Sequence, residues 1–126
     1  MKIFNVSKNR LVAENVIFRK SIRELIFGLI PYRYKEGNWL NFLKPKTFKE
    51  TDAMLFKVSN TDSIHTVFMS FPISVFLLDK EMKVIEKVRL NPFEVFIPTK
   101  KFAYFVEMID KKFEEVNIND ELKIIK

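Results

Sequence analysis

The chain contains no cysteine, only two glycines and a single histidine among its 126 residues. The absence of cysteine excludes disulfides, thiolate nucleophiles and cysteine-ligated metals, and it fits a reducing compartment. Two glycines are too few for a glycine-rich loop that cradles phosphate groups. One histidine without cysteine leaves too few ligands for a zinc-type centre. We therefore expect neither a metal nor a cofactor.

Long apolar runs are also missing. The apolar runs are short, as at Val75–Leu78, whereas a membrane-spanning helix needs about 20 apolar residues. The first ten residues, MKIFNVSKNR, are interrupted by polar and charged side chains where a signal peptide has an unbroken apolar stretch. The sequence therefore predicts a soluble, cytoplasmic protein with no membrane span. Hydrophobic residues still make up 48% of the chain, which is enough for one sizeable core and a single domain over residues 1–126.

Positive charge is concentrated in the first half of the chain. The net charge is +6, and residues 1–60 hold twelve Lys and Arg against five Asp and Glu. Such a basic half can attract nucleic acid or another acidic partner. However, 17 of the 22 basic residues are lysine, whereas base readout favours the bidentate arginine. Nucleic-acid binding through this half is therefore an alternative rather than the leading hypothesis.

Short apolar segments with turn residues between them dominate the pattern. Met1–Val6 and Leu11–Phe18 flank the polar Ser7–Arg10, which predicts a hairpin of two strands. Further strands are predicted at Ala53–Val58, Ile64–Met69, Ile73–Leu78, Lys83–Leu90, Phe102–Met108 and Leu122–Ile125. Phe93–Ile97 lies between two prolines and is predicted to be an edge strand or a loop. The pattern predicts a mainly β fold, an antiparallel sandwich or partly closed barrel with one or two short helices.

Two segments show helical spacing. Ser21–Gly28 begins with a capping box and ends at a glycine, which predicts a short helix. Asp110–Val116 predicts one or two further helical turns. Between them, Tyr32–Asp52 is predicted to be an ordered loop whose aromatic residues, including Trp39 and Phe42, pin it to the core. Aromatic side chains among lysines also suit stacking on nucleic-acid bases, which leaves that alternative open.

The segment from Asn60 to Asp79, NTDSIHTVFMSFPISVFLLD, resembles the signature of the family called domain of unknown function 192. The matching residues are Ser63, Ile64, His65, Thr66, Phe68, Met69, Phe71, Pro72, Ile73, Leu78 and Asp79. Weaker matches lie at Gly28-Leu29, Leu90–Phe93 and Val106–Met108, so the resemblance extends from about residue 11 to residue 124. It implies a mostly β, sandwich-like domain without an established activity. Ser74 stands where the family pattern has an aspartate, so any role of that carboxylate is lost here.

His65 is the only side chain in the sequence whose unperturbed pKa lies near neutrality. Glu107 lies within an apolar strand, where a carboxylate needs either a place on the outer face of the sheet or a partner such as Arg89, Arg23 or His65. We expect the acidic residues of the C-terminal part to form a solvated face; they are Asp110, Glu114, Glu115, Asp120 and Glu121. The candidate binding residues are Ser63, His65, Thr66, Met69 and Glu107.

The leading hypothesis is a non-catalytic domain that binds a small molecule or a protein near the His65 strand. The first alternative is a hydrolase-type enzyme that uses His65 and a nearby carboxylate, with Ser63 or Ser74 as nucleophile and Asp62 or Asp79 as the acid. The second alternative is nucleic-acid binding through the basic N-terminal half. No glycine-flanked nucleophile elbow supports the enzyme. The sequence does not name the ligand or partner.

Overall fold

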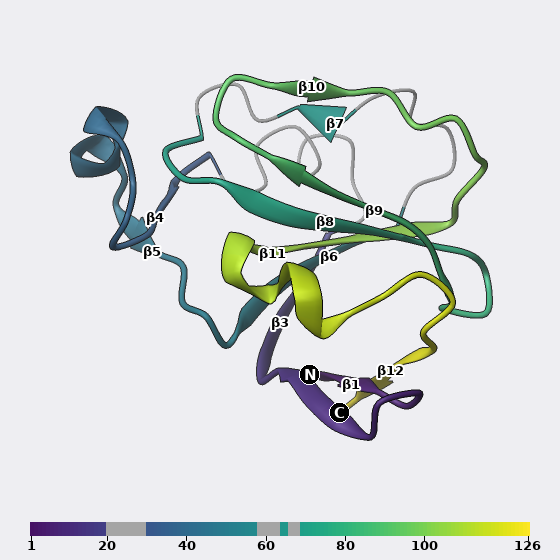
Figure 1. Ribbon diagram of the computed structural model, residues 1–126. Coiled ribbons are helices and arrows are strands. Elements are labelled where there is room, and N and C mark those ends of the chain that lie inside the picture. The colour runs from purple at the N-terminus through teal and green to yellow at the C-terminus, as the bar shows by residue number, and fades with distance from the viewer. Residues whose placement is uncertain (20–29, 58–63, 66–68) are drawn as a thin grey trace.

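The computed structural model describes residues 1–19, 30–57, 64–65 and 69–126 (Figure 1). These residues form twelve strands and two short 3-10 helices, η1 (Trp39–Leu43) and η2 (Asp110–Glu115). The strands are β1 (Lys2–Asn5), β2 (Arg10–Ala13), β3 (Asn15–Arg19), β4 (Tyr32–Arg33), β5 (Lys46–Thr47), β6 (Asp52–Lys57), β7 (Ile64–His65), β8 (Ile73–Leu78), β9 (Val84–Leu90), β10 (Val95–Phe96), β11 (Tyr104–Ile109) and β12 (Leu122–Ile125). The mainly β fold is confirmed. The predicted helix at Ser21–Gly28 lies outside the described residues.

A five-stranded sheet in the order β3-β6-β11-β8-β9 forms the centre of the molecule (Figure 1). All its neighbouring pairs are antiparallel except β3 and β6, which run parallel. The described strands form open sheets rather than a closed barrel. The parallel pair departs from the purely antiparallel prediction. The chain between β3 and β6 is long enough for the crossover that a parallel pair requires.

Both faces of this sheet are covered, so β8, which lies between β11 and β9, is buried throughout. All six residues of β8 are buried. Because side chains alternate along a strand, Val75 and Leu77 belong to one hydrophobic cluster, whereas Phe76 and Leu78 belong to another. We call these the first and second clusters. A strand buried on both faces reads as a continuous apolar run, as this one does.

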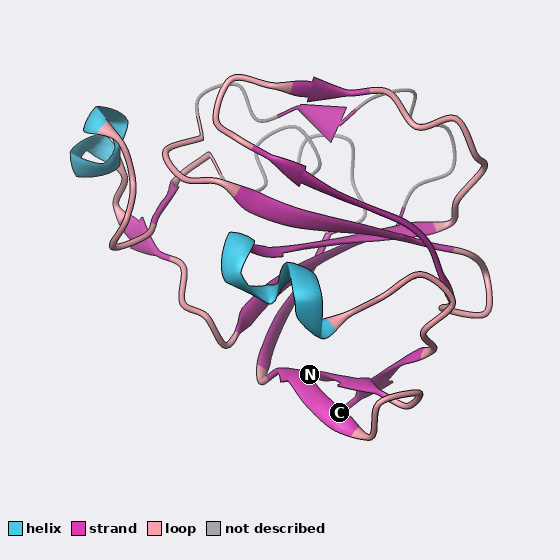
Figure 2. Cartoon of the chain, in the orientation of Figure 1, coloured by secondary structure: helices cyan, strands magenta, loops and turns pink. Residues whose placement is uncertain are grey.

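Smaller elements cover the two faces (Figure 2). The three-stranded sheet β12-β1-β2 contributes Ile3, Val12 and Leu122 to the second cluster. On the other face, β10 pairs with β7, and Phe96 of β10 packs against the first cluster. In the described part of the chain, no helix has the length and apolar character needed to cross a membrane.

The predicted strand Leu11–Phe18 is wrong as a single element. β2 ends at Ala13, the chain bends at Glu14, and β3 begins at Asn15 in the central sheet. The backbone N–H groups of Glu14 and Asn15 both donate to the carbonyl of Thr51, at 2.8 and 3.1 Å. These two bonds hold the chain where it passes from one sheet to the other. The continuous apolar pattern therefore belongs to strands of two different sheets.

Residues 32–47, from β4 through η1 to β5, form a segment that we call the arm. Its strands pair in parallel, with Tyr32 opposite Lys46. Figures 1 and 2 show η1 at the far end of the arm, standing away from the central sheet. Buried aromatic side chains at and beside its base join it to the first cluster; these are Tyr32, Tyr34 and Phe48. The Phe48 ring lies 5.6 Å from Tyr32 and 5.9 Å from Phe71.

Candidate functional site

The residues predicted from the sequence as a binding site are only partly described. His65 lies in β7, where its backbone pairs with Val95 of β10. Ser63 and Thr66 lie outside the described residues. Met69 is buried in the first cluster, with 3% of its surface exposed. The grouping of these residues with Glu107 into one site stays a prediction.

Glu107 lies at the middle of the central sheet. Its neighbours across the strands are Met54 of β6 and Val75 of β8, and both belong to the first cluster. Glu107 is therefore on the same face of the sheet as the cluster that contains Met69. Only 5% of Glu107 is exposed, and burial raises the pKa of its carboxyl to about 8. At neutral pH this carboxyl is mainly protonated.

Arg89, one of the three partners suggested for Glu107, pairs with another carboxylate instead. Arg89 Nε lies 2.9 Å from Asp110 Oδ1, and the Arg89 guanidinium lies 4.4 Å from the Phe113 ring centre. Arg23, the other predicted arginine, lies outside the described residues. Among the described residues no side chain forms a hydrogen bond or ion pair with Glu107. Arg89 lies opposite Ser74, which lies opposite Met108 on the other face of the sheet from Glu107. The sequence pattern does not show which strand positions lie opposite one another, so it could not exclude this pairing.

Two residues of the alternative hydrolase have structural roles. The Ser74 hydroxyl is buried and donates to the backbone carbonyls of Ile109 and Asp110, at 3.1 and 3.0 Å. Ser74 pairs with Met108 of the second cluster, so it lies on the opposite face from Glu107. Asp79 caps a turn by accepting hydrogen bonds from two backbone N–H groups, at 2.9 Å each. These contacts do not bring Ser74 or Asp79 together with Glu107.

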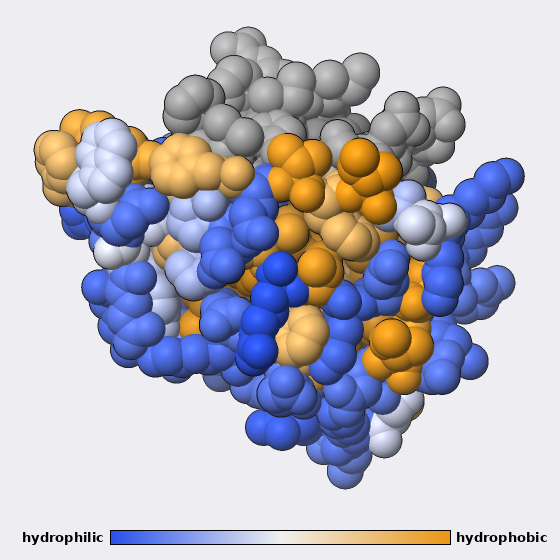
Figure 3. All heavy atoms as spheres, turned by 45° about the horizontal axis from the view of Figure 1, so that its top comes forward, coloured by the Kyte–Doolittle hydropathy of each residue, from blue (hydrophilic) through white to orange (hydrophobic). Residues whose placement is uncertain are grey.

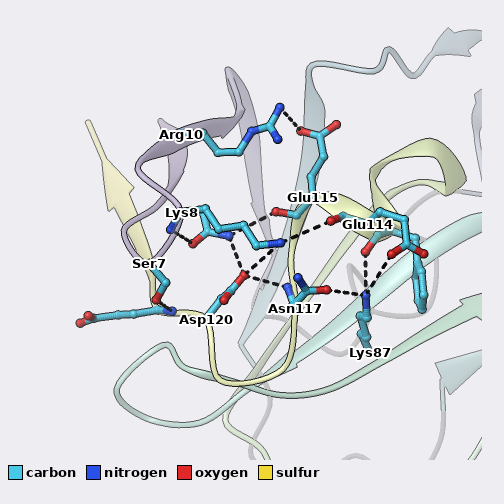
Figure 4. A network of polar contacts seen from close by, with 11 residues as sticks. Ser7, Lys8, Arg10, Lys87, Glu114, Glu115, Asn117 and Asp120 are labelled. Atoms are coloured by element: carbon cyan, nitrogen blue, oxygen red, sulfur yellow. Dashed lines mark hydrogen bonds and ion pairs between the residues drawn. The ribbon is translucent and has the colours of Figure 1, made fainter.

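A polar network joins the first and last parts of the chain (Figure 4). Asp120 Oδ2 accepts from Asn5 Nδ2 at 2.9 Å and from the Asn117 backbone N–H at 2.8 Å, and Lys8 Nζ lies 3.8 Å away. Burial raises the pKa of Asp120, but these bonds and the Lys8 charge outweigh it and lower the pKa below its usual value. The prediction of a solvated acidic face is wrong for Asp120, which is buried.

The arm carries an unusual group of exposed apolar side chains. Trp39 is 69% exposed, Phe42 73% and Leu43 59%. The prediction that Trp39 and Phe42 pin the loop to the core is therefore wrong, because Tyr32, Tyr34 and Phe48 do so instead. In Figure 3, hydrophobic side chains are exposed at the η1 end of the molecule. Clustered exposure of this kind is typical of an interaction surface.

A set of hydrogen bonds fixes η1 despite its exposure. The Asn41 side chain accepts from the Tyr34 backbone N–H at 3.0 Å and donates to the Tyr34 carbonyl at 2.6 Å. Ser70 donates to the same Asn41 oxygen at 2.9 Å, and the Asn38 backbone N–H donates to the Ser70 carbonyl at 2.7 Å. Asn38 Oδ1 also accepts from the Leu40 N–H at 2.9 Å, which caps the 3-10 helix.

Gly37 is required by a close approach rather than by its backbone angles. A Cβ atom at this position would lie 2.5 Å from both Cγ and Oδ1 of Asn41. That distance is below any ordinary contact, so a larger residue would displace the Asn41 side chain. The glycine therefore allows the Asn41 amide to reach the backbone of Tyr34.

A cleft of about 620 Å³ lies between η1 and the strands of the arm. Trp39 and Phe42 line it together with Arg33 and Lys35. Among the described residues no carboxylate pairs with Arg33, whereas Lys35 lies 3.3 Å from Glu50. The cleft can therefore hold a group that combines an apolar surface with negative charge.

Charged residues tie the base of the arm to η2. The Tyr34 hydroxyl donates to Glu50 Oε1 at 2.8 Å, and Lys111 of η2 lies 3.2 Å from Glu36 and 3.7 Å from Glu50. Burial, followed by the bond to Glu50, raises the pKa of Tyr34. The hydrogen bond from Tyr34 and the one from Lys35 lower the pKa of Glu50. The phenol and the carboxylate therefore keep opposite protonation states at neutral pH.

A sequence signal for this surface exists. Residues 37–49, GNWLNFLKPKTFK, contain three lysines and no acidic residue, and four large apolar side chains lie within five positions. Their spacing fits neither a strand face nor a long helix, and Gly37 and Pro45 bound them. An apolar run that cannot be assigned to a core element is a candidate for exposure.

Residues 37–125 match the sequence model of the family DUF192, which is described as an uncharacterised ACR. This chain belongs to the DUF192 family. The match begins at Gly37 and so includes η1, while it leaves out the earlier residues that the resemblance was expected to cover from residue 11. No curated protein matches the chain. Membership of DUF192 brings no established activity.

Two solved structures resemble this DUF192 protein in fold. One is a proposed transcription regulator from Sinorhizobium meliloti 1021, which is 14% identical, with 97% of this chain and 89% of that chain covered and a TM-score of 0.71. The other is a protein of unknown function from Novosphingobium aromaticivorans DSM 12444, which is 8% identical, with 98% and 82% covered and a TM-score of 0.71. Identities this low show a shared fold and nothing further.

Proposed function

We propose that this DUF192 protein is a non-catalytic binding module and that the arm is its binding surface. The observation that carries this proposal is the exposure of Trp39, Phe42 and Leu43 on a 3-10 helix that side-chain hydrogen bonds hold in place. Exposed apolar residues lower solubility, and no packing role inside the described chain explains them. A partner that covers these side chains explains why they are exposed in the free protein.

Rigidity supports the same proposal. A flexible loop loses conformational entropy when it binds, whereas a loop already fixed in its bound shape loses little. The bonds of Asn41 and the cap at Asn38 order η1 before any partner arrives. Tryptophan and arginine are also the residues most enriched among those that dominate binding energy, and Trp39 and Arg33 line the same cleft.

The charge of the arm indicates what kind of partner fits. Arg33 and Lys46 of the arm and Lys49 just after it are exposed. The one carboxylate of the arm, Glu36, lies 3.2 Å from Lys111 of η2. A cationic and apolar surface is complementary to a partner that offers negative charge beside an apolar or flat group. Single-stranded nucleic acid and an anionic lipid surface both meet this description.

Trp39 makes the proposal simple to test because it is the only tryptophan in the chain. Its emission therefore reports on the arm alone. We expect a shift or quenching of that emission when either a single-stranded oligonucleotide or vesicles containing phosphatidylserine are added. The oligonucleotide is included because the S. meliloti structure is described as a proposed transcription regulator.

The matched variants are Phe42→Ser, in the arm, and Ile97→Ser, which removes a side chain exposed to a similar extent, 69% against 73%, after β10. Phe42→Ser should weaken the response to the active probe, and Ile97→Ser should leave it unchanged. If neither probe alters the emission of Trp39 in low salt, the arm does not bind such a partner and the proposal is wrong.

A second candidate is the predicted site on the face covered by β7, with Ser63, His65, Thr66, Met69 and Glu107. The buried carboxyl of Glu107, to which none of the described side chains bonds, favours it, because a protonated carboxyl can donate a hydrogen bond to a ligand. A screen of small molecules by thermal shift tests this candidate. A stabilising compound whose effect survives both His65→Ala and Glu107→Gln would exclude this site.

A further inference from the structure

We infer that the arm docks on an anionic membrane surface, with Trp39, Phe42 and Leu43 entering the interface between headgroups and acyl chains. This inference rests on the proposed function and names its partner. Peripheral proteins commonly bind in this way, through a projecting apolar element that basic residues flank.

The distribution of apolar side chains around η1 favours a membrane over a stacked base. In a 3-10 helix, residues three apart eclipse one another, so Trp39 and Phe42 lie on one face. Leu40 and Leu43 are related in the same way and lie on a neighbouring face. Base stacking would use the two aromatic rings and leave Leu43, 59% exposed, without a role. A lipid interface surrounds the helix and covers both faces.

The backbone of η1 is prepared for an environment poor in water. The N–H of Leu40 bonds to Asn38 Oδ1 at 2.9 Å, that of Asn41 to the Asn38 carbonyl at 2.9 Å, and that of Lys44 to the Asn41 carbonyl at 3.2 Å. A backbone group without a hydrogen-bond partner is costly in hydrocarbon, where no water can satisfy it. These bonds let the end of the arm enter the interface without leaving those three donors unpaired.

The cations of the arm lie behind its apolar end. Arg33 belongs to β4 and Lys46 to β5, whereas the apolar side chains belong to η1 at the far end of the arm (Figure 1). Lys46 Nζ lies 5.6 Å from the Tyr32 ring, at the base. With η1 in the interface, these cations would be at the depth of the lipid headgroups. Positive residues at that depth strengthen binding to anionic lipid.

The shape of the molecule allows this approach. Figures 1 and 2 show η1 projecting beyond the rest of the described chain on that side. The end of the arm can therefore reach a flat surface before the central sheet does.

Co-sedimentation of the full chain with vesicles tests the inference. One set contains phosphatidylcholine alone, and the other contains phosphatidylcholine with about one third phosphatidylserine. We expect binding to the anionic set, with a blue shift of Trp39 emission. Phe42→Ser and Leu43→Ser should each weaken binding about tenfold or more, because each removes a large apolar side chain from the interface. Arg33→Gln should weaken it about fivefold, and only on anionic vesicles.

Ile97→Ser is the matched control and should bind as the unaltered protein does. Because Phe42, Leu43 and Ile97 are all exposed, circular dichroism and thermal melting should show that all three variants fold. Absence of vesicle binding together with binding of the oligonucleotide would overturn the membrane inference and leave the proposed function standing. Absence of both would overturn both. Equal losses in Ile97→Ser and Phe42→Ser would also overturn the inference, because the arm would then have no special role.

Discussion

The side-chain amide of Asn41 forms both hydrogen bonds of a peptide group with Tyr34, accepting from its N–H at 3.0 Å and donating to its carbonyl at 2.6 Å. Tyr34 is buried in the first cluster and its ring lies 5.9 Å from that of Phe71. Asn41 belongs to the exposed helix η1. This pair therefore transmits the rigidity of the core to the end of the arm.

Replacement of Asn41 by alanine should destabilise the protein by about 2–3 kcal/mol, because two bonds to the Tyr34 backbone and one from Ser70 are lost together. Urea denaturation measures this loss. Ser70→Ala removes only the bonds of the Ser70 hydroxyl, so we expect a smaller cost. A loss of less than 0.5 kcal/mol for Asn41→Ala, on the scale of ordinary surface substitutions, would contradict this role.

Gly37→Ala should cost nearly as much as Asn41→Ala, because the new Cβ would lie 2.5 Å from the Asn41 side chain and displace it. The effect depends on the Asn41 amide being present. In a chain that already carries Asn41→Ala, the same glycine substitution should therefore be almost neutral. A double-mutant cycle by urea denaturation measures this coupling. Additive losses would show that Gly37 matters for another reason.

The sequence predicted the central sheet well because its strands obey simple periodicity. The segments Ile73–Leu78 and Lys83–Leu90 were expected as strands and form β8 and β9. The prediction of one strand over Leu11–Phe18 failed because an apolar pattern indicates which residues are buried and not which sheet they belong to. The chain passes from one sheet to the other at Glu14, and apolar residues continue on both sides of that position. Periodicity also cannot report which strands pair, so the parallel contact of β3 with β6 was not foreseen.

Stability should depend on pH through Glu107. Its carboxyl has a pKa of about 8 when folded, against an ordinary value of 4.5. A pKa that is raised on folding stabilises the protein fully below the ordinary value, and this contribution is lost as the pH rises through the folded value. We therefore expect the free energy of unfolding to decrease between pH 5 and pH 8, by up to about 1.4 kcal/mol per pH unit.

Glu107→Gln tests that expectation because glutamine keeps the shape of the protonated side chain and cannot ionise. The variant should be more stable than the unaltered protein at pH 8, and its unfolding free energy should change less with pH. Glu14→Gln, which removes an exposed carboxylate, should keep the original pH dependence. Urea denaturation at pH 5, 6.5 and 8 compares the three. If the unfolding free energy changes with pH in the same way in all three proteins, Glu107 does not have the raised pKa and this account of it is wrong.

Asp120→Ala should destabilise the protein by about 2–4 kcal/mol, because the Asn5 side chain and the Asn117 N–H both lose their acceptor. The pKa of Asp120 is lowered on folding, so its contribution is present above the ordinary pKa and disappears as the pH falls below it. Asp120→Asn keeps one acceptor oxygen and should cost less. Thermal melting at pH 7 and in acid measures both effects, and equal melting temperatures in all three proteins would exclude this role.

The candidate binding surface was harder to foresee than the fold. The sequence of Tyr32–Asp52 shows aromatic residues near lysines, but it does not distinguish the aromatic residues that are buried from those that are exposed. Tyr32, Tyr34 and Phe48 are buried, whereas Trp39 and Phe42 are exposed. The difference comes from hydrogen bonds of Asn38 and Asn41, which turn the chain outward. Such side-chain contacts depend on residues distant in sequence, such as Ser70, and hydrophobic patterning does not report them.

Mapping of backbone amide chemical shifts by NMR tests the central claim most directly. The labelled protein is titrated with bicelles that contain phosphatidylserine, and the shifts are followed residue by residue. We predict that the largest changes occur in residues 37–44 of the arm and that β1, β9 and β12 change little. Largest changes over β10, or no changes at any residue, would contradict the claim that the arm is the binding surface.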